Sequence, residues 1–139
     1  MRSLSTRSRL LLPLVVWTLF VWVSRLRNIW SDDELSDTGQ IIRTVVAVIF
    51  VAFAAATGVR LWQLRGRALE TVDRWLIWAF IVWTIGFWLV RGVGIILDDH
   101  PIGFTVVHSV LMAISISLAV VGSRAVSDRS ISSTLATAR

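Results

Sequence analysis

The fold is decided by the stretch WLIWAFIVWTIGFWLVRGVGIIL, residues Trp75–Leu97, which carries a single charged residue, Arg91, in 23 positions. A helix of this length spans roughly 30 Å, which matches the hydrocarbon core of a bilayer. The apolar residues form a continuous block and not a one-sided stripe. The pattern therefore predicts a helix that is surrounded by lipid.

Three further apolar blocks of similar length accompany this stretch, at residues 10–30, 41–62 and 102–121. The chain of 139 residues is 55% hydrophobic and has a mean hydropathy of +0.73, more than a soluble domain of this size needs. We therefore expect an all-α fold, an integral membrane four-helix bundle in one domain, 1–139. The segment 124–139 is rich in Ser, Thr and Ala, and we expect a flexible cytoplasmic tail there.

The positions of the arginines predict the orientation. All 14 basic residues are arginine, and with the N-terminus inside, ten of them fall in the inner segments. The outer side receives four arginines, all in or beside a span, and six of the nine acidic residues. This positive-inside bias predicts that both termini are cytoplasmic, in a bacterial cytoplasmic (inner) membrane. The net charge of +5 is thus a topology signal, and no nucleic-acid partner is expected.

An internal repeat joins the first and third spans. At an offset of 66 residues, the segment from Val16 to Asp33 shares eight identities in 18 positions with the segment from Val82 to Asp99. We interpret this as a duplicated helical hairpin, with halves 10–62 and 76–123. Because each half has two spans, the halves are expected to be parallel repeats about an axis along the membrane normal. Spans two and four share no comparable identity.

The repeated residues lie on one face of each helix. At 100° per residue they occupy one arc, and Val16 alone falls outside it. We expect these faces to point inward. The arc includes Arg25 and Arg91, each seven residues before an aspartate, Asp32 or Asp98, and so about 10 Å deeper along the helix.

An arginine inside a span is costly and needs a reason. One hypothesis is an arginine pair that lines a polar cleft near the outer surface, with Asp32 and Asp98 at its mouth. The alternative is that Arg25 and Arg91 reach towards the headgroups or form structural ion pairs. His108 in the fourth span completes the candidate polar site. We expect it to form a helix–helix hydrogen bond to Ser or Thr, and a single deep histidine does not support a haem site.

No catalytic, metal-binding or cofactor site is predicted. Asp98, Asp99 and His100 are read as a solvated turn before Pro101, because adjacent carboxylates on a helix end point in different directions. There is no cysteine, no phosphate-binding glycine loop and no nucleophile motif. The sequence therefore predicts a protein that is not an enzyme.

Small residues recur at four-residue spacing and predict close packing of the spans, within one copy or between copies. The pairs are Ala52 with Ala56, Ala54 with Gly58, Ala113 with Ser117, and Ser115 with Ala119. The tryptophans divide into an interface set and a deeper set. We expect the deeper set to serve packing, and it consists of Trp17, Trp22, Trp83 and Trp88.

The lysine-free composition is typical of a GC-rich genome, such as that of an actinomycete or one of its phages. In size, helix count and basic tails the chain resembles small phage-encoded membrane proteins, holins and exclusion or immunity proteins. The resemblance covers architecture only, so no site residue follows from it. It implies a protein that self-associates in the lipid bilayer and perturbs or permeabilises it. The alternatives are an accessory subunit with a membrane-protein partner, and a small transporter or channel.

Overall fold

The computed structural model describes residues 8–31, 36–64 and 67–127, and all the regular secondary structure in these ranges is helical, with no strand. A short 3-10 helix, η1 (Ser8–Leu11), leads into α1 (Leu12–Trp30). The remaining helices are α2 (Asp37–Gln63), α3 (Thr71–Leu97) and α4 (Ile102–Ser127). The predicted all-α fold is confirmed. All four helices are long and apolar enough to cross a membrane, which indicates a multi-pass membrane protein.

Three helices are longer than the apolar blocks that predicted them. The second and third begin four residues earlier, because polar caps satisfy their first N–H groups. The Ser36 hydroxyl accepts a hydrogen bond from the Gly39 N–H (3.3 Å), and Glu70 and Asp73 form a capping box. Helix α4 ends at Ser127, so residues 124–127 of the predicted tail are helical. The rest of that tail lies outside the described residues.

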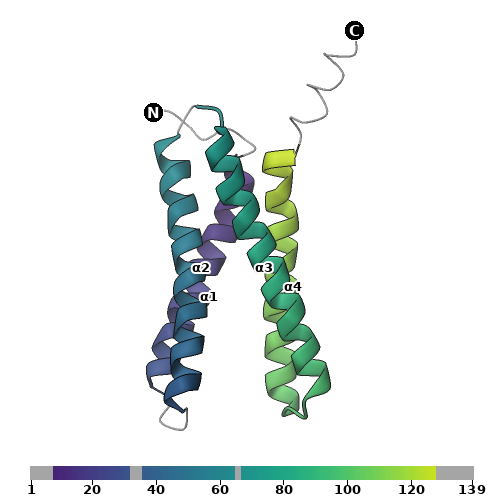
Figure 1. Ribbon diagram of the computed structural model, residues 1–139. Helices are drawn as coiled ribbons and strands as arrows, with labels where there is room; N and C mark the ends of the chain where they lie inside the picture. The colour runs from purple at the N-terminus through teal and green to yellow at the C-terminus, as the bar shows by residue number, and fades with distance from the viewer. Residues whose placement is uncertain (1–7, 32–35, 65–66, 128–139) are drawn as a thin grey trace.

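The helices pair as two hairpins, α1 with α2 and α3 with α4. In Figure 1 the hairpins converge at the end that carries η1 and diverge towards the end where α3 turns into α4. Because the four long helices run alternately in opposite directions, η1 and the last turn of α4 lie at the same end of the bundle.

The hairpins meet along α2 and α3, and also along α4 and the antiparallel segment formed by η1 and α1. Three contacts follow one register, Leu11 against Gly122, Trp17 against Ser115, and Arg25 against His108, and we call them the α1–α4 seam. The first contact is close, because a Cβ on Gly122 would lie 3.1 Å from Leu11 Cδ2. The later contacts use longer side chains, which bridge the wider separation of the diverging hairpins.

An aromatic cluster fills the centre of the bundle. Trp22 of α1 stacks on Phe50 of α2, with ring centroids 4.1 Å apart, and Phe87 of α3 packs edge-on against both rings. Trp22 is 4% exposed and Phe50 is fully buried. Stacked and edge-on aromatic pairs add about 0.5–1.5 kcal/mol each to the effect of burial. Because the cluster draws on three helices, it holds both hairpins together.

The end of the bundle with η1 is also joined by polar contacts. Asp73, which is 1% exposed, accepts hydrogen bonds from Arg60 Nε (2.6 Å) and from the Glu70 N–H (2.9 Å). Arg74 donates to the carbonyl oxygen of Val126 (2.6 Å), so α3 caps the C-terminal turn of α4. Asp73 and Arg74 precede the apolar block at 75–97, and the structure places both in the first turn of α3.

We expect Gly122→Leu to lower the free energy of unfolding by about 1–3 kcal/mol, because the added side chain displaces Leu11 and Leu14 from a tight contact. Gly86→Leu is the matched control, since a Cβ on Gly86 meets no atom within 4 Å. The measurement is denaturant unfolding of the full chain in detergent micelles, followed by tryptophan fluorescence. Equal losses in the two variants would contradict the α1–α4 register.

Candidate functional site

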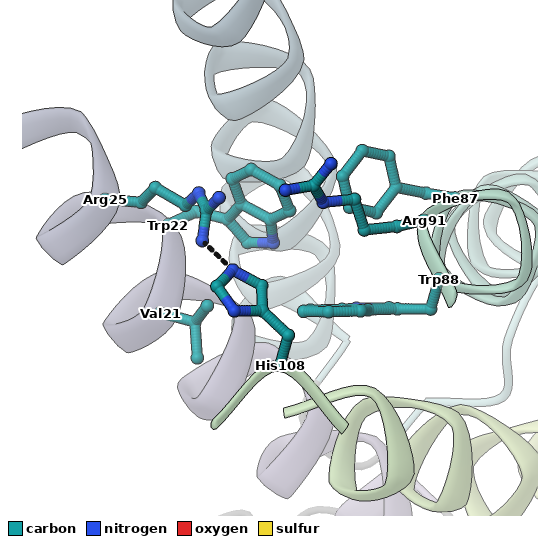
Figure 2. A pocket seen from close by; sticks show the side chains of 7 residues that line it. All are labelled: Val21, Trp22, Arg25, Phe87, Trp88, Arg91 and His108. Carbon is teal, nitrogen blue, oxygen red and sulfur yellow. Dashed lines mark hydrogen bonds between the residues drawn. The ribbon is translucent and has the colours of Figure 1, made fainter. Parts of the chain in front are cut away.

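A partly open pocket lies between the two hairpins, and Figure 2 shows its lining side chains. Its lining comes from three helices and consists of Val21, Trp22, Arg25, Phe87, Trp88, Arg91 and His108. Three of the five predicted site residues, Arg25, Arg91 and His108, are thus brought together. The cavity has a volume of about 10 Å³, which is room for roughly one water-sized group.

The two predicted aspartates do not share this position. Asp98 follows the last residue of α3 and is exposed, and its backbone N–H donates to the Gly94 carbonyl (3.1 Å). In the part of the chain that the structure describes, its carboxylate has no hydrogen bond or ion pair. Asp32 lies outside the described residues. Asp98 therefore does not line the pocket, contrary to the predicted cleft with Asp98 at its mouth.

His108 joins α4 to α1. Its Nε2 lies 3.2 Å from Nη1 of Arg25, and its Nδ1 lies 2.9 Å from the Phe104 carbonyl oxygen. A carbonyl oxygen only accepts, and a guanidinium only donates. The Nδ1 atom therefore carries the proton, and Nε2 accepts from Arg25. These contacts assign a neutral ring to His108, because an imidazolium has no acceptor.

The expected hydrogen bond from His108 to Ser or Thr is wrong. The guanidinium of Arg25 reaches across the seam and takes the free nitrogen of His108, since it is a charged and stronger donor. Ser115, one of the small residues on α4, instead accepts a hydrogen bond from Trp17 Nε1 (3.0 Å). Both contacts connect the hairpins.

Phe104 organises the other side of the pocket, and sequence reasoning missed it. Its ring stacks on His108, with centroids 3.8 Å apart, and the Arg91 guanidinium lies over the ring at 5.6 Å from its centroid. A cation over an aromatic face is favourable by about 0.5–2 kcal/mol. The signal was available, because Phe104 precedes His108 by four residues and so shares its face of the helix.

No carboxylate of the described residues pairs with the positive charge of the pocket. Arg25 and Arg91 each have a neutral partner, His108 or Phe104. Within the described ranges, the ion pair present is that of Arg60 and Asp73, at the other end of the bundle. The expected structural ion pairs of Arg25 and Arg91 are thus not found among these residues.

The repeated residues occupy matching environments. Trp22 and Trp88 are 4% and 3% exposed, whereas Val16 and Val82 are both 64% exposed. The faces that contain Arg25 and Arg91 point inward, as expected. One pair differs. Trp17 donates to Ser115, whereas the buried Nε1 of Trp83 has no hydrogen-bond partner among the described residues, and the Trp83 ring centroid lies 6.0 Å from that of Phe50.

The residues after α3 form a turn. His100 Nδ1 lies 3.0 Å from the Asp98 carbonyl oxygen, and Asp98 and Asp99 are both exposed. No group of three or more His, Cys, Asp or Glu side chains that could hold a metal ion occurs in the described part of the chain.

Comparison of the chain with protein-family models, with curated proteins and with solved structures finds no match.

We expect ¹⁵N NMR of the protein in micelles to show His108 as a neutral ring with its proton on Nδ1. Arg25→Leu should shift the Nε2 resonance towards that of a free ring, because it removes the donor to that atom. Arg27→Leu, an exposed position two residues further on, should leave the resonance unchanged. A proton on Nε2 in the unaltered protein would contradict the assigned contact.

Proposed function

We propose that this chain is a non-enzymatic integral membrane protein of the bacterial cytoplasmic membrane that self-associates and thereby permeabilises it, in the manner of phage-encoded holin-like proteins. The observation that carries the proposal is the position of Arg25, Arg91 and His108 on the inner faces between the hairpins. Ionisable groups within spans face a bundle interior or a water-filled path. In an assembly of several copies, the same faces are suited to line such a path.

Outward faces of two helices support self-association. Ala52, Ala55 and Ala56 on α2 are exposed, as are Ala113 and Ser117 on α4. Small side chains allow close approach of helices in lipid, where packing and not water expulsion drives association. Their neighbours Ala54 and Ala119 are already fully buried within the chain. The remaining small residues are therefore available to a second copy.

Matched burial supports the duplicated hairpin. Besides the identities of α1 and α3, the helices α2 and α4 bury corresponding positions at an offset of 65 residues. The pairs are Phe50 with Ser115, Ala54 with Ala119, Thr57 with Gly122, and Leu61 with Val126. A parallel repeat relates α1 to α3 and α2 to α4, so similar faces are buried in both halves.

We expect regulated expression in a bacterial host to collapse the membrane potential, as read by a potential-sensitive dye. The double variant Arg25→Leu/Arg91→Leu should reduce the effect strongly, because the inner faces lose their charge. Arg27→Leu, which is exposed on the same helix, is the matched control and should behave as the unaltered chain.

Membrane insertion of each variant is checked by its amount in the membrane fraction. An unchanged potential at full expression would refute permeabilisation. Copurification of another membrane protein in that case would favour the accessory-subunit alternative.

Self-association is measured by disulfide cross-linking of single-cysteine variants, which is possible because the chain has no native cysteine. Ala52→Cys should form disulfide-linked dimers, whereas Val82→Cys, which is exposed among bulky residues on α3, should not.

We further expect both termini to be cytoplasmic, with the α2–α3 connection on the same side. At basal expression, a membrane-impermeant maleimide should label Asp99→Cys in spheroplasts and should label Ala68→Cys only after lysis. Both positions are exposed, so reactivity reports the side of the membrane. The reverse labelling pattern would refute the orientation that the ten inner arginines predict.

A further inference from the structure

We infer that the pocket between the hairpins binds an oxyanion of the phosphate type, held by the guanidinium groups of Arg25 and Arg91. The chemistry fits a phospholipid headgroup or a free phosphate ion. The inference rests on the membrane location in the proposed function, but not on its permeabilising activity.

The first reason is unbalanced charge. Two guanidinium groups line one pocket, and no carboxylate among the described residues pairs with either of them. Like charges repel strongly where water is sparse, because the local dielectric constant is low. An anion between them converts this repulsion into attraction. Apolar walls from Val21, Trp22 and Trp88 strengthen that attraction by excluding water.

The second reason is the supply of hydrogen-bond donors. A guanidinium has five N–H groups in a planar fork that matches two oxygens of a phosphate. Arg25 has a hydrogen bond from Nη1 to His108, and Arg91 has its contact with the Phe104 ring. Figure 2 shows the two side chains extending towards each other from α1 and α3, with the Trp22 indole between them. The other N–H groups of both arginines have no hydrogen bond among the described residues, so they can bind a ligand at the open side of the pocket.

The third reason is the way the donors are held. Neutral His108 accepts from Arg25 and is itself fixed by its bond to the Phe104 carbonyl. Phe104 also lies beneath Arg91. One turn of α4 therefore orients both guanidinium groups without neutralising them. A carboxylate in place of His108 would neutralise Arg25 and compete with a bound anion. The neutral histidine ring leaves the charge of Arg25 available to an anion.

The fourth reason is depth. Arg25 lies five residues before the end of α1, and Arg91 six residues before the end of α3, which is about 8–9 Å along each axis. Helix α3 has 27 residues and is about 40 Å long, whereas the hydrocarbon core is about 30 Å thick. The pocket thus lies just inside the hydrocarbon boundary, within reach of lipid phosphates. The cavity has room for about one phosphate oxygen, and the pocket is partly open beside it.

The test measures ligand binding to the delipidated full-length protein in nonionic detergent, by native mass spectrometry and by titration. The probes are phosphatidylglycerol, diacylglycerol as the lipid without phosphate, and inorganic phosphate. We expect phosphatidylglycerol or inorganic phosphate to bind, and diacylglycerol not to bind. Arg25→Leu and Arg91→Leu should each weaken binding by about tenfold or more, because each removes charge-assisted hydrogen bonds. Arg27→Leu should change the affinity less than about twofold, since an exposed position contributes little.

Binding of phosphatidylglycerol alone identifies the lipid as the source, and competition by inorganic phosphate identifies the free ion; either result supports the inference. It is overturned if neither probe binds, if diacylglycerol binds equally well, or if Arg27→Leu weakens binding as much as Arg25→Leu. Arg25→Lys keeps the charge and loses the planar fork, so it should fold and bind with intermediate affinity. Because micelles sustain no membrane potential, this result is independent of the permeabilisation assay.

Discussion

The α1–α4 seam determines how the two hairpins sit together, and the remaining features of the bundle depend on it. Leu11 against Gly122 sets the closest approach, Trp17 against Ser115 follows, and Arg25 against His108 spans the widest part. Two of these three contacts are polar. Within lipid a polar side chain has no water to bind, so an acceptor on the facing helix fixes both its height and its rotation.

The same requirement explains two buried polar groups elsewhere in the bundle, Asp73 and Thr84. Asp73 is buried because Arg60 and the Glu70 N–H satisfy it, and Thr84 donates to the Phe80 carbonyl of its own helix. Both arrangements keep charge and dipoles paired inside the chain. The pocket at the other end differs, since Arg25 and Arg91 have neutral partners only among the described residues. Two guanidinium groups with neutral partners at one pocket are characteristic of a binding site.

The helices and the inward faces could be predicted from the sequence, because both follow from local patterns. Long apolar blocks predict spans, and a 100° rotation per residue places Trp22 and Arg25 on one arc. The partner of His108 could not be predicted, since it depends on the height of α4 relative to α1, and no repeat or spacing encodes that height. The burial of Asp73 was missed for a related reason. In the sequence, a carboxylate that caps a helix looks the same as an exposed acidic residue in a loop. Its burial depends on Arg60, which lies on another helix.

The contrast between Trp17 and Trp83 gives the molecule a built-in optical reporter. The two indoles occupy matching positions, yet the N–H of Trp17 is shared with Ser115 across the seam, whereas that of Trp83 has no acceptor. Separation of the hairpins breaks the hydrogen bond of Trp17, whereas the Trp83 N–H has no hydrogen bond to lose. Vibrational spectra of the indole N–H can therefore register hairpin opening at Trp17, with Trp83 as an internal reference in the same chain.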